Sequence, residues 1–206
     1  MEQTIGTDVR EKLVISFSIM KGKGIGLSKE IALMFREQKK SPKFFMTKQS
    51  YIYKFNNLHV KIYADKYLDS KLEIVIYKVD ENVQSIVKDV LVKAQPFYIN
   101  GEKNSIFLTS CAKFNIEDTE GLMTKLNERS KSEFCCVKEG NIYNISMNMV
   151  YNLKAESKSS KFEDSVFIRM PIQKGFLFLI PYIVPKIFHE KERIRRGVKQ
   201  SMEEII

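Results

Sequence analysis

Residues 70–73 read Ser-Lys-Leu-Glu, and residues 160–163 read Ser-Lys-Phe-Glu, 90 positions further along the chain. The same offset joins other identical side chains: Lys48 with Lys138, Ile52 with Ile142, Tyr53 with Tyr143, and Phe44 with Phe134. One register that carries all of these matches indicates a tandem duplication. Because two units are too few for a solenoid, the pattern predicts one pseudo-symmetric molecule with a continuous antiparallel sheet and helices on one face.

The order of predicted elements repeats with the side chains. The first half predicts strands near residues 12–20, 44–55, 58–64 and 72–79. Its helices are predicted at 27–38, capped by Ser28, and at 80–94, capped by Asp80 and ended by Pro96. The second half predicts strands near 105–115, 133–138, 141–153 and 162–171. Its helical segments are 117–129 and about 174–205, the second broken in its first part by Pro181 and Pro185.

Each half therefore predicts the order β-α-β-β-β-α, which is an α+β fold. The predicted organisation is an N-terminal extension at 1–11, a first repeat at 12–96, a second repeat at 97–188 and a C-terminal helical tail at 189–206. The tail carries basic residues at 191–199 and ends in Glu203 and Glu204, so it predicts an amphipathic helix.

The charge of the chain points to a polyanionic partner. The sequence holds 34 Lys and Arg residues against 25 Asp and Glu residues, which gives a formal net charge of +9. Such a balance favours nucleic acid or an anionic membrane surface. The longest apolar run, 176–184, is about half of the roughly 20 residues that span a bilayer, so no membrane insertion is expected.

Enzyme and metal signatures are weak. The cysteines are Cys111, Cys135 and Cys136, an odd count without a CxxC pair, which favours a reducing, intracellular location. His59 and His189 have no ligand residue at metal spacing. The glycines of 22–26 lack the dinucleotide spacing and predict a flexible turn. We therefore expect no enzymatic activity and no cofactor.

Two stretches resemble the TATA-box-binding protein family. Residues 31–33, Ile-Ala-Leu, stand eight residues before 42–45, Pro-Lys-Phe-Phe, and this is similar to the family's I-A-L, eight residues, P-K-x-F. In the second half, residues 110–122 resemble the family's S-C-x-x-K-F-x-I-x-x-E-G-L with small gaps. The resemblance extends over residues 12–188.

The resemblance implies a saddle of two repeats whose concave sheet face binds the minor groove of double-stranded DNA. Apolar wedges then kink the duplex, and A·T-type groove patterns and DNA deformability set the preference. The DNA-binding residues that it implies, together with the lysines expected to neutralise phosphates, are Phe44, Phe45, Thr47, Lys48, Tyr53, Tyr67, Lys71, Phe134, Lys138, Tyr143 and Lys161. Of the adjacent Phe44 and Phe45, one is expected in the core, and alternation alone leaves open whether Tyr53 and Tyr143 face the groove or the helices.

The resemblance also implies protein partners. General transcription factors or the RNA polymerase machinery would contact the convex helices, and the location would be the nucleus in a eukaryote and the cytoplasm otherwise. Departures from the family pattern suggest a divergent member or paralogue. Cys135 and Ser157 stand where the second repeat's wedges would be, and Glu73 and Glu163 lie on strands that would face DNA.

Two other functions remain open. A sheet around a long C-terminal helix also describes a helix-grip fold similar to START-type lipid-binding domains, with residues 175–188 as a cavity-lining or membrane-touching element. The predicted helix at 80–94 and the duplication count against that fold. The third possibility is a protein-interaction scaffold that keeps the duplicated architecture without binding DNA.

Overall fold

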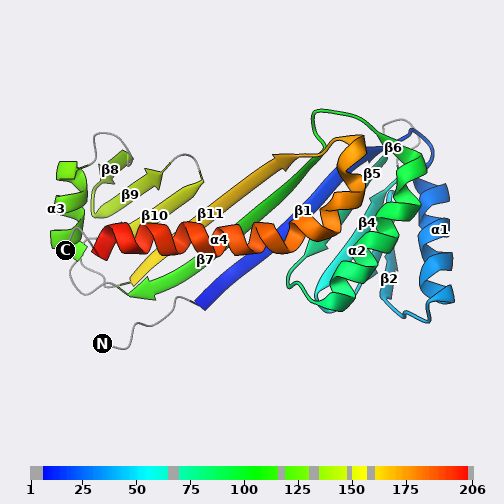
Figure 1. Cartoon of the computed structure of the whole chain (residues 1–206), viewed down its shortest axis with the longest axis horizontal. Coiled ribbons are helices and arrows are strands. Elements are labelled where there is room, and N and C mark those ends of the chain that lie inside the picture. The colour runs from blue at the N-terminus through cyan, green and yellow to red at the C-terminus, as the bar shows by residue number, and fades with distance from the viewer. Residues whose placement is uncertain are drawn as a thin grey trace. The chain divides into compact units, whose positions relative to one another are not determined.

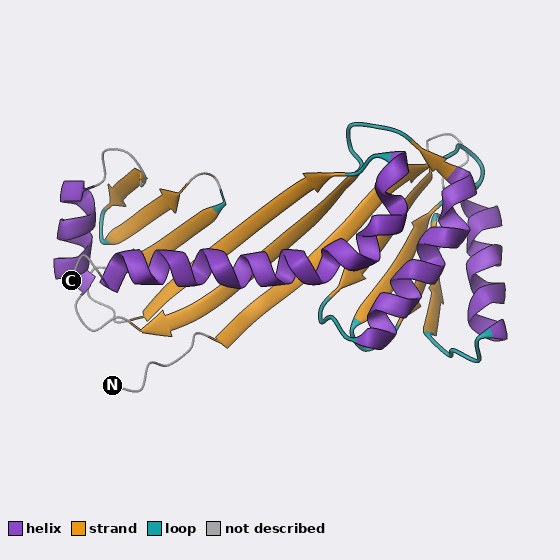
Figure 2. Cartoon of the chain, viewed as in Figure 1, coloured by secondary structure: helices purple, strands orange, loops and turns teal. Residues whose placement is uncertain are grey.

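The computed structural model of the chain describes residues 7–64, 70–115, 119–129, 135–147, 150–156 and 161–203. Over these residues the protein is an α+β fold with four α-helices and a large antiparallel sheet (Figures 1 and 2). The order of strands across the sheet is β2-β3-β4-β5-β1-β7-β11-β10-β9-β8, and a short strand β6 pairs with β1. None of the described helices is both long and apolar enough to cross a membrane.

The first half of the chain forms six strands and two helices. Their bounds are β1 Thr7–Ile19, α1 Gly24–Glu37, β2 Lys43–Met46, β3 Ser50–Lys54, β4 Leu58–Tyr63, β5 Ser70–Ile76, α2 Glu81–Ala94 and β6 Tyr98–Ile99, with a 3₁₀ turn η1 at Gln95–Phe97. The predicted strand at 44–55 is wrong, because it is two strands joined by a turn. The side-chain oxygen of Thr47 accepts from the backbone N–H of Ser50 at 3.0 Å and so closes that turn.

The two helices of the first half begin differently. Asp80 caps α2, as predicted, because its carboxylate accepts from the backbone N–H of Val83 at 2.7 Å. This bond lowers the pKa of Asp80 below its usual value. Ser28 does not cap α1, because the helix already begins at Gly24, inside the predicted glycine turn. The Ser28 hydroxyl is instead buried against the hydroxyl of Tyr53, at 2.9 Å.

The second half repeats the element order. Its bounds are β7 Ser105–Asn115, α3 Thr119–Arg129, β8 Cys135–Glu139, β9 Ile142–Met147, β10 Tyr151–Glu156, β11 Lys161–Pro171 and α4 Ile180–Glu203, with a 3₁₀ helix η2 at Lys174–Leu179. The predicted strand at 141–153 is again two strands. Each half therefore has four strands between its helices, where three were predicted.

Helix α4 is continuous through the two prolines that were expected to break it. Pro181 lies in the first turn, where the missing backbone N–H has no helical partner to lose. Pro185 lies inside the helix. The 3₁₀ helix η2 precedes α4, so the irregular backbone is confined to residues 174–179.

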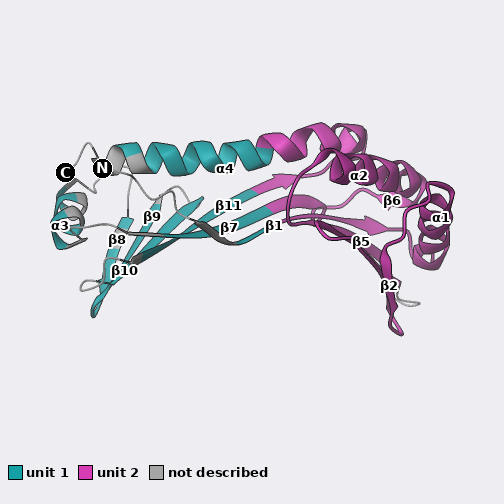
Figure 3. Cartoon of the chain, turned by 90° about the horizontal axis from the view of Figure 1, so that it is seen from below, with its two compact units in different colours: residues 1–11, 108–168, 187–206 teal, residues 12–107, 169–186 magenta. Residues whose placement is uncertain are grey.

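The chain divides into two compact units (Figure 3). Unit 2 contains residues 12–107 and 169–186, and unit 1 contains residues 1–11, 108–168 and 187–206. In unit 2, α1 and α2 lie on one side of the strands, and alternate strand residues such as Phe17, Val60 and Ile74 are buried toward them. In unit 1, the strands bury Ile145, Leu153, Phe162 and Val166 in a core that also holds Val198 of α4. We call the other side of the strands in each unit its open face.

Buried ion pairs attach α4 to the strands of unit 1. Asp164 of β11 is 2% exposed and accepts hydrogen bonds from Arg195 of α4 at 2.8 to 3.1 Å and from the backbone N–H of Ala112 at 3.1 Å. Burial, together with the Asp164 charge, raises the pKa of Tyr151 far above its usual value. Lys191, 4% exposed, pairs with Glu11, which also accepts from the hydroxyl of Ser110.

Close packing at the start of α1 gives a first prediction. A Cβ on Gly24 would lie 2.9 Å from the Cβ of Ala64 and 2.9 Å from the Oγ of Ser70. Gly24→Ala is therefore expected to lower the free energy of unfolding by about 1–3 kcal/mol, measured by urea denaturation. The matched control is Gly26→Ala, where the nearest atom to the new Cβ is 4.0 Å away. This control is expected to gain about 0.5 kcal/mol, and equal losses in the two variants would refute the packing argument.

Candidate nucleic-acid interface

The open face of unit 2 is basic and aromatic. Across the strands, Lys43 of β2 pairs with Lys54 of β3, which pairs with His59 of β4. One row further, Phe45 pairs with Ile52 and Ile52 with Lys61. Because directly paired residues of antiparallel strands share a face, these side chains form one surface on the side away from α1 and α2. The surface therefore combines positive charge with exposed rings.

The adjacent phenylalanines of β2 point to opposite faces. Phe44 packs on Tyr53, with ring centroids 5.1 Å apart, and Phe45 lies under the ammonium group of Lys54, 4.5 Å from its ring centroid. The two rings are 52% and 47% exposed. The expectation that one of them is in the core was wrong, because β2 is the edge strand and all four of its residues are exposed. Phe45 is thus an apolar ring at the rim of the open face.

Glu73 lies among these cations. Its carboxylate pairs with the Lys71 ammonium at 2.5 Å and accepts from the Tyr63 hydroxyl at 3.2 Å. Partial burial, with the Glu73 charge, raises the pKa of Tyr63. The carboxylate is therefore partly neutralised within the face, which reduces its repulsion of a polyanion.

His59 lies opposite Lys54 on the open face. Its Nδ1 lies 3.3 Å from the Tyr77 hydroxyl, and the two rings meet edge to face with centroids 5.0 Å apart. Burial and the charges of Lys54 and Lys61 lower the pKa of His59. The imidazole therefore binds its proton less readily in the folded protein than in the unfolded chain.

This shift gives a pH prediction. Nearby phosphates would raise the pKa of His59, so the complex would bind a proton that the free protein lacks, and duplex affinity is expected to rise as the pH falls from 7.5 to 5.5. The slope is at most about tenfold per pH unit for one proton. Anisotropy titrations at several pH values measure it, and His59→Gln is expected to flatten the profile. In the absence of DNA, the free energy of unfolding is expected to decrease as the pH falls below 6.5, the pKa of an unperturbed histidine. The reason is that the unfolded chain binds the proton of His59 more readily than the folded protein does.

The other residues of the first half that were expected at the interface lie in three different places. Tyr53 is buried toward α1 and donates to the backbone oxygen of Ser28 at 3.0 Å, and burial raises its pKa. Thr47 is engaged in its turn, and Lys48 is exposed at the tip of the same turn. Lys71 lies on the open face.

In unit 1, Lys138 lies over the ring of Tyr143, 4.9 Å from its centroid, and Tyr143 packs on the core beside α4. Both therefore lie on the helix side of the strands. Lys161 is the first residue of β11. Tyr67, Phe134 and Ser157 lie outside the described residues.

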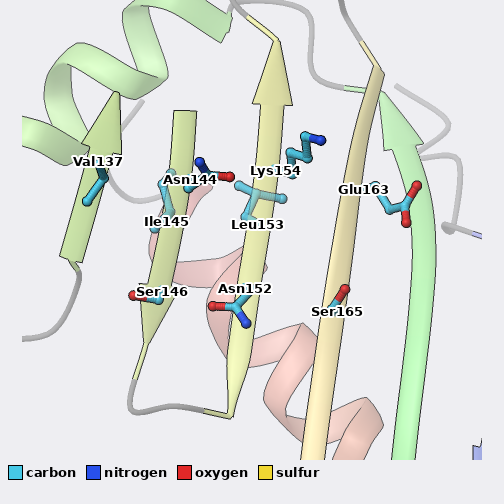
Figure 4. Close-up of a pocket in the computed structure, with 9 residues that line it drawn as sticks. All are labelled: Val137, Asn144, Ile145, Ser146, Asn152, Leu153, Lys154, Glu163 and Ser165. Atoms are coloured by element: carbon cyan, nitrogen blue, oxygen red, sulfur yellow. The ribbon is translucent and has the colours of Figure 1, made fainter. Parts of the chain in front are cut away.

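The open face of unit 1 is polar and hollowed (Figure 4). The hollow extends over β8, β9, β10 and β11, and its volume is ≈ 440 Å³. Its lining includes the carboxamides of Asn144 and Asn152 and the hydroxyls of Ser146 and Ser165. Lys154 lies directly opposite Asn144 on one side and Glu163 on the other. The exposed apolar side chain at its edge is Val137, 47% exposed.

Sequence reasoning found Phe45 and Lys71 but missed other residues of these faces. Residues 58–63, Leu-His-Val-Lys-Ile-Tyr, alternate strictly, and this pattern alone places His59, Lys61 and Tyr63 on one face. The sequence did not predict that Asn144 and Asn152 lie on neighbouring strands, because residues 141–153 were predicted as a single strand without a turn.

The open faces supply charge, stacking surface and hydrogen-bonding groups. Among the described residues, no cluster of three or more His, Cys, Asp or Glu side chains is placed to hold a metal ion. No protein-family model and no curated protein matches the chain.

Proposed function

We propose that this chain binds double-stranded DNA through the open faces of its strands and bends the duplex from the minor groove. The observation that carries the proposal is the open face of unit 2. There, Lys54 lies over the exposed ring of Phe45, Lys61 lies two strands away in the same row beyond Ile52, and the carboxylate of Glu73 is held by Lys71. Lysines that follow a strand surface neutralise phosphates, and an exposed apolar ring at its rim acts as a wedge between base steps.

We propose also that the two halves are tandem repeats forming a saddle, in a divergent relative of the TATA-box-binding protein family. Across the first half, Phe45, Ile52, Lys61 and Glu73 are successive cross-strand neighbours. Across the second half, the same sequence of neighbours is Val137, Asn144, Lys154 and Glu163. The recurring Lys-Glu pair supports duplication, with corresponding residues 90 to 93 positions apart instead of the single offset of 90 that the sequence matches predict.

From this correspondence we propose Val137 as the second wedge. Val137, exposed on the open face, stands in the second half where Phe45 stands in the first, whereas Cys135 pairs with Ser146 one row away. Val137 is apolar but lacks an aromatic ring, so we propose that the first repeat kinks DNA more strongly than the second. The helix-bearing side is then proposed to contact transcription proteins inside the cell.

Fluorescence anisotropy of labelled duplexes over a salt series tests the proposal. Wild-type protein is expected to bind with a steep dependence on salt. Phe45→Ala is expected to weaken binding about tenfold or more, because it removes the wedge. Phe44→Ala is the matched control, since it removes an equally exposed phenylalanine one residue away on the helix side.

Equal losses of duplex affinity in the two variants would contradict the proposal that Phe45 acts as a wedge. If the wild-type protein binds no duplex at low salt, the DNA-binding function is refuted. The protein-interaction scaffold then becomes the better reading of the same fold.

A further inference from the structure

Two carboxamides distinguish the hollow of unit 1 from the corresponding rows of unit 2. Where the first half presents Ile52 beside Phe45, the second half presents the carboxamide of Asn144 beside Val137. Asn152, Ser146 and Ser165 line the next row across β10, β9 and β11. In Figure 4 these side chains come from three neighbouring strands and lie along the same stretch of the sheet.

The two carboxamides are available to a ligand. Asn144 and Asn152 are exposed, and no described residue forms a hydrogen bond with either carboxamide. Each carboxamide offers an NH₂ donor and an oxygen acceptor. Glu163 adds a carboxylate that only accepts when ionised. The hollow therefore presents several acceptors together with its donors.

In the minor groove, A·T and G·C base pairs differ by one hydrogen-bonding group. An A·T pair presents only acceptors there, whereas a G·C pair adds the guanine 2-amino donor. Against an A·T pair, each carboxamide can donate from its NH₂ group, but its oxygen finds no donor on the bases. A desolvated acceptor without a partner costs about 1–3 kcal/mol. Against a G·C pair, one carboxamide can accept from the 2-amino group while its own NH₂ donates to a ring acceptor.

We propose that the hollow of unit 1 accepts guanine-containing base steps by accepting a hydrogen bond from the guanine 2-amino group, with Asn144 and Asn152 as the specificity-determining residues. The inference rests on the proposed minor-groove binding and adds the chemical group that is read. The apolar row of unit 2, with Phe45 and Ile52, has no equivalent acceptor pair. Base preference is therefore unequal between the two halves.

Inosine isolates the group, because it differs from guanine only by lacking the 2-amino group. Two duplexes of one G·C-containing sequence are compared, with guanine or with inosine at every guanine position, so that every binding register is covered. Affinities are measured by anisotropy for wild type and for Asn144→Ala with Asn152→Ala. Inosine also makes the duplex easier to deform. The quantity compared is therefore the fold loss of affinity that the double variant causes, measured separately for each duplex.

The expected result is that the double variant loses at least about fivefold more affinity for the guanine duplex than for the inosine duplex, with an unchanged salt slope. Asn141→Ala, which removes an exposed carboxamide from the β8–β9 turn outside the hollow, is expected to leave both affinities unchanged. Unfolding midpoints confirm that the variants fold.

Equal losses for the two duplexes, while both still bind, would overturn the guanine inference and leave the proposed function standing. A larger loss for the inosine duplex would overturn it as well. Absence of binding to either duplex at low salt would refute the proposed function and the inference together.

Discussion

Replacing Arg195 by alanine is expected to lower the free energy of unfolding by about 3–5 kcal/mol, which is a large part of the stability of a chain this size. The reason is that Asp164 is buried on the core side of β11. Its carboxylate accepts hydrogen bonds there from Nε and from a terminal nitrogen of the Arg195 guanidinium. In the variant, the carboxylate keeps the N–H of Ala112 and the hydroxyl of Tyr151 but loses the guanidinium charge of Arg195. An uncompensated buried charge costs far more than the ion pair itself contributes.

Urea denaturation followed by circular dichroism measures this loss. The control is Arg193→Ala, because the Arg193–Glu190 pair is exposed, and no measurable change is expected there. A second variant separates charge from packing. Asp164→Asn with Arg195→Met removes both charges and keeps an oxygen for the Ala112 N–H, so it is expected to recover most of the lost stability. If it is as unstable as Arg195→Ala, the buried charge is not the cause.

The second large effect concerns DNA. Lys54→Ala with Lys61→Ala is expected to reduce the slope of log affinity against log salt by about 2 and the affinity at 0.1 M salt by about 50-fold. Each lysine lies on the open face of unit 2, so each is expected to neutralise one phosphate. The loss is expected to be similar for all duplex sequences, because phosphates carry no base information.

The matched control is Lys29→Ala with Lys88→Ala. These exposed lysines belong to α1 and α2, on the helix side of the same unit, and their removal changes the net charge equally. Affinity in this control is expected to stay within about twofold of wild type, because distant surface charges are screened. If both double variants weaken binding equally, net charge rather than the open face holds the DNA.

Much of the fold follows from periodic sequence. Ser105–Asn115 was predicted to the residue, and Asp80 caps its helix as its position indicated. The missed boundary within residues 44–55 has a clear cause: the turn closed by Thr47 contains neither glycine nor proline, so the composition of the sequence does not mark it. The side-chain bonds of a single threonine define it instead.

The site was less predictable than the fold. The family resemblance drew attention to Tyr53 and Tyr143, but whether a strand residue faces helices depends on pairing partners far along the chain. Tyr53 is buried because its hydroxyl reaches Ser28 on α1, a contact that no local pattern reveals. The pairing of Lys61 with Glu73 became visible only once the register of β4 and β5 was known.

Strand β1 and helix α4 each contribute residues to both compact units. This division affects the order in which the protein can fold during its synthesis. Residues 169–186, including the buried Leu177, Ile180 and Val184, belong to unit 2, while the following turns of α4 belong to unit 1. A ribosome that has released the first hundred residues has not yet synthesised this part of the unit 2 core. Neither unit can complete its core before the final helix emerges, so a stop codon after residue 168 is expected to yield no folded fragment. In translation, the two halves must mature together rather than one after the other.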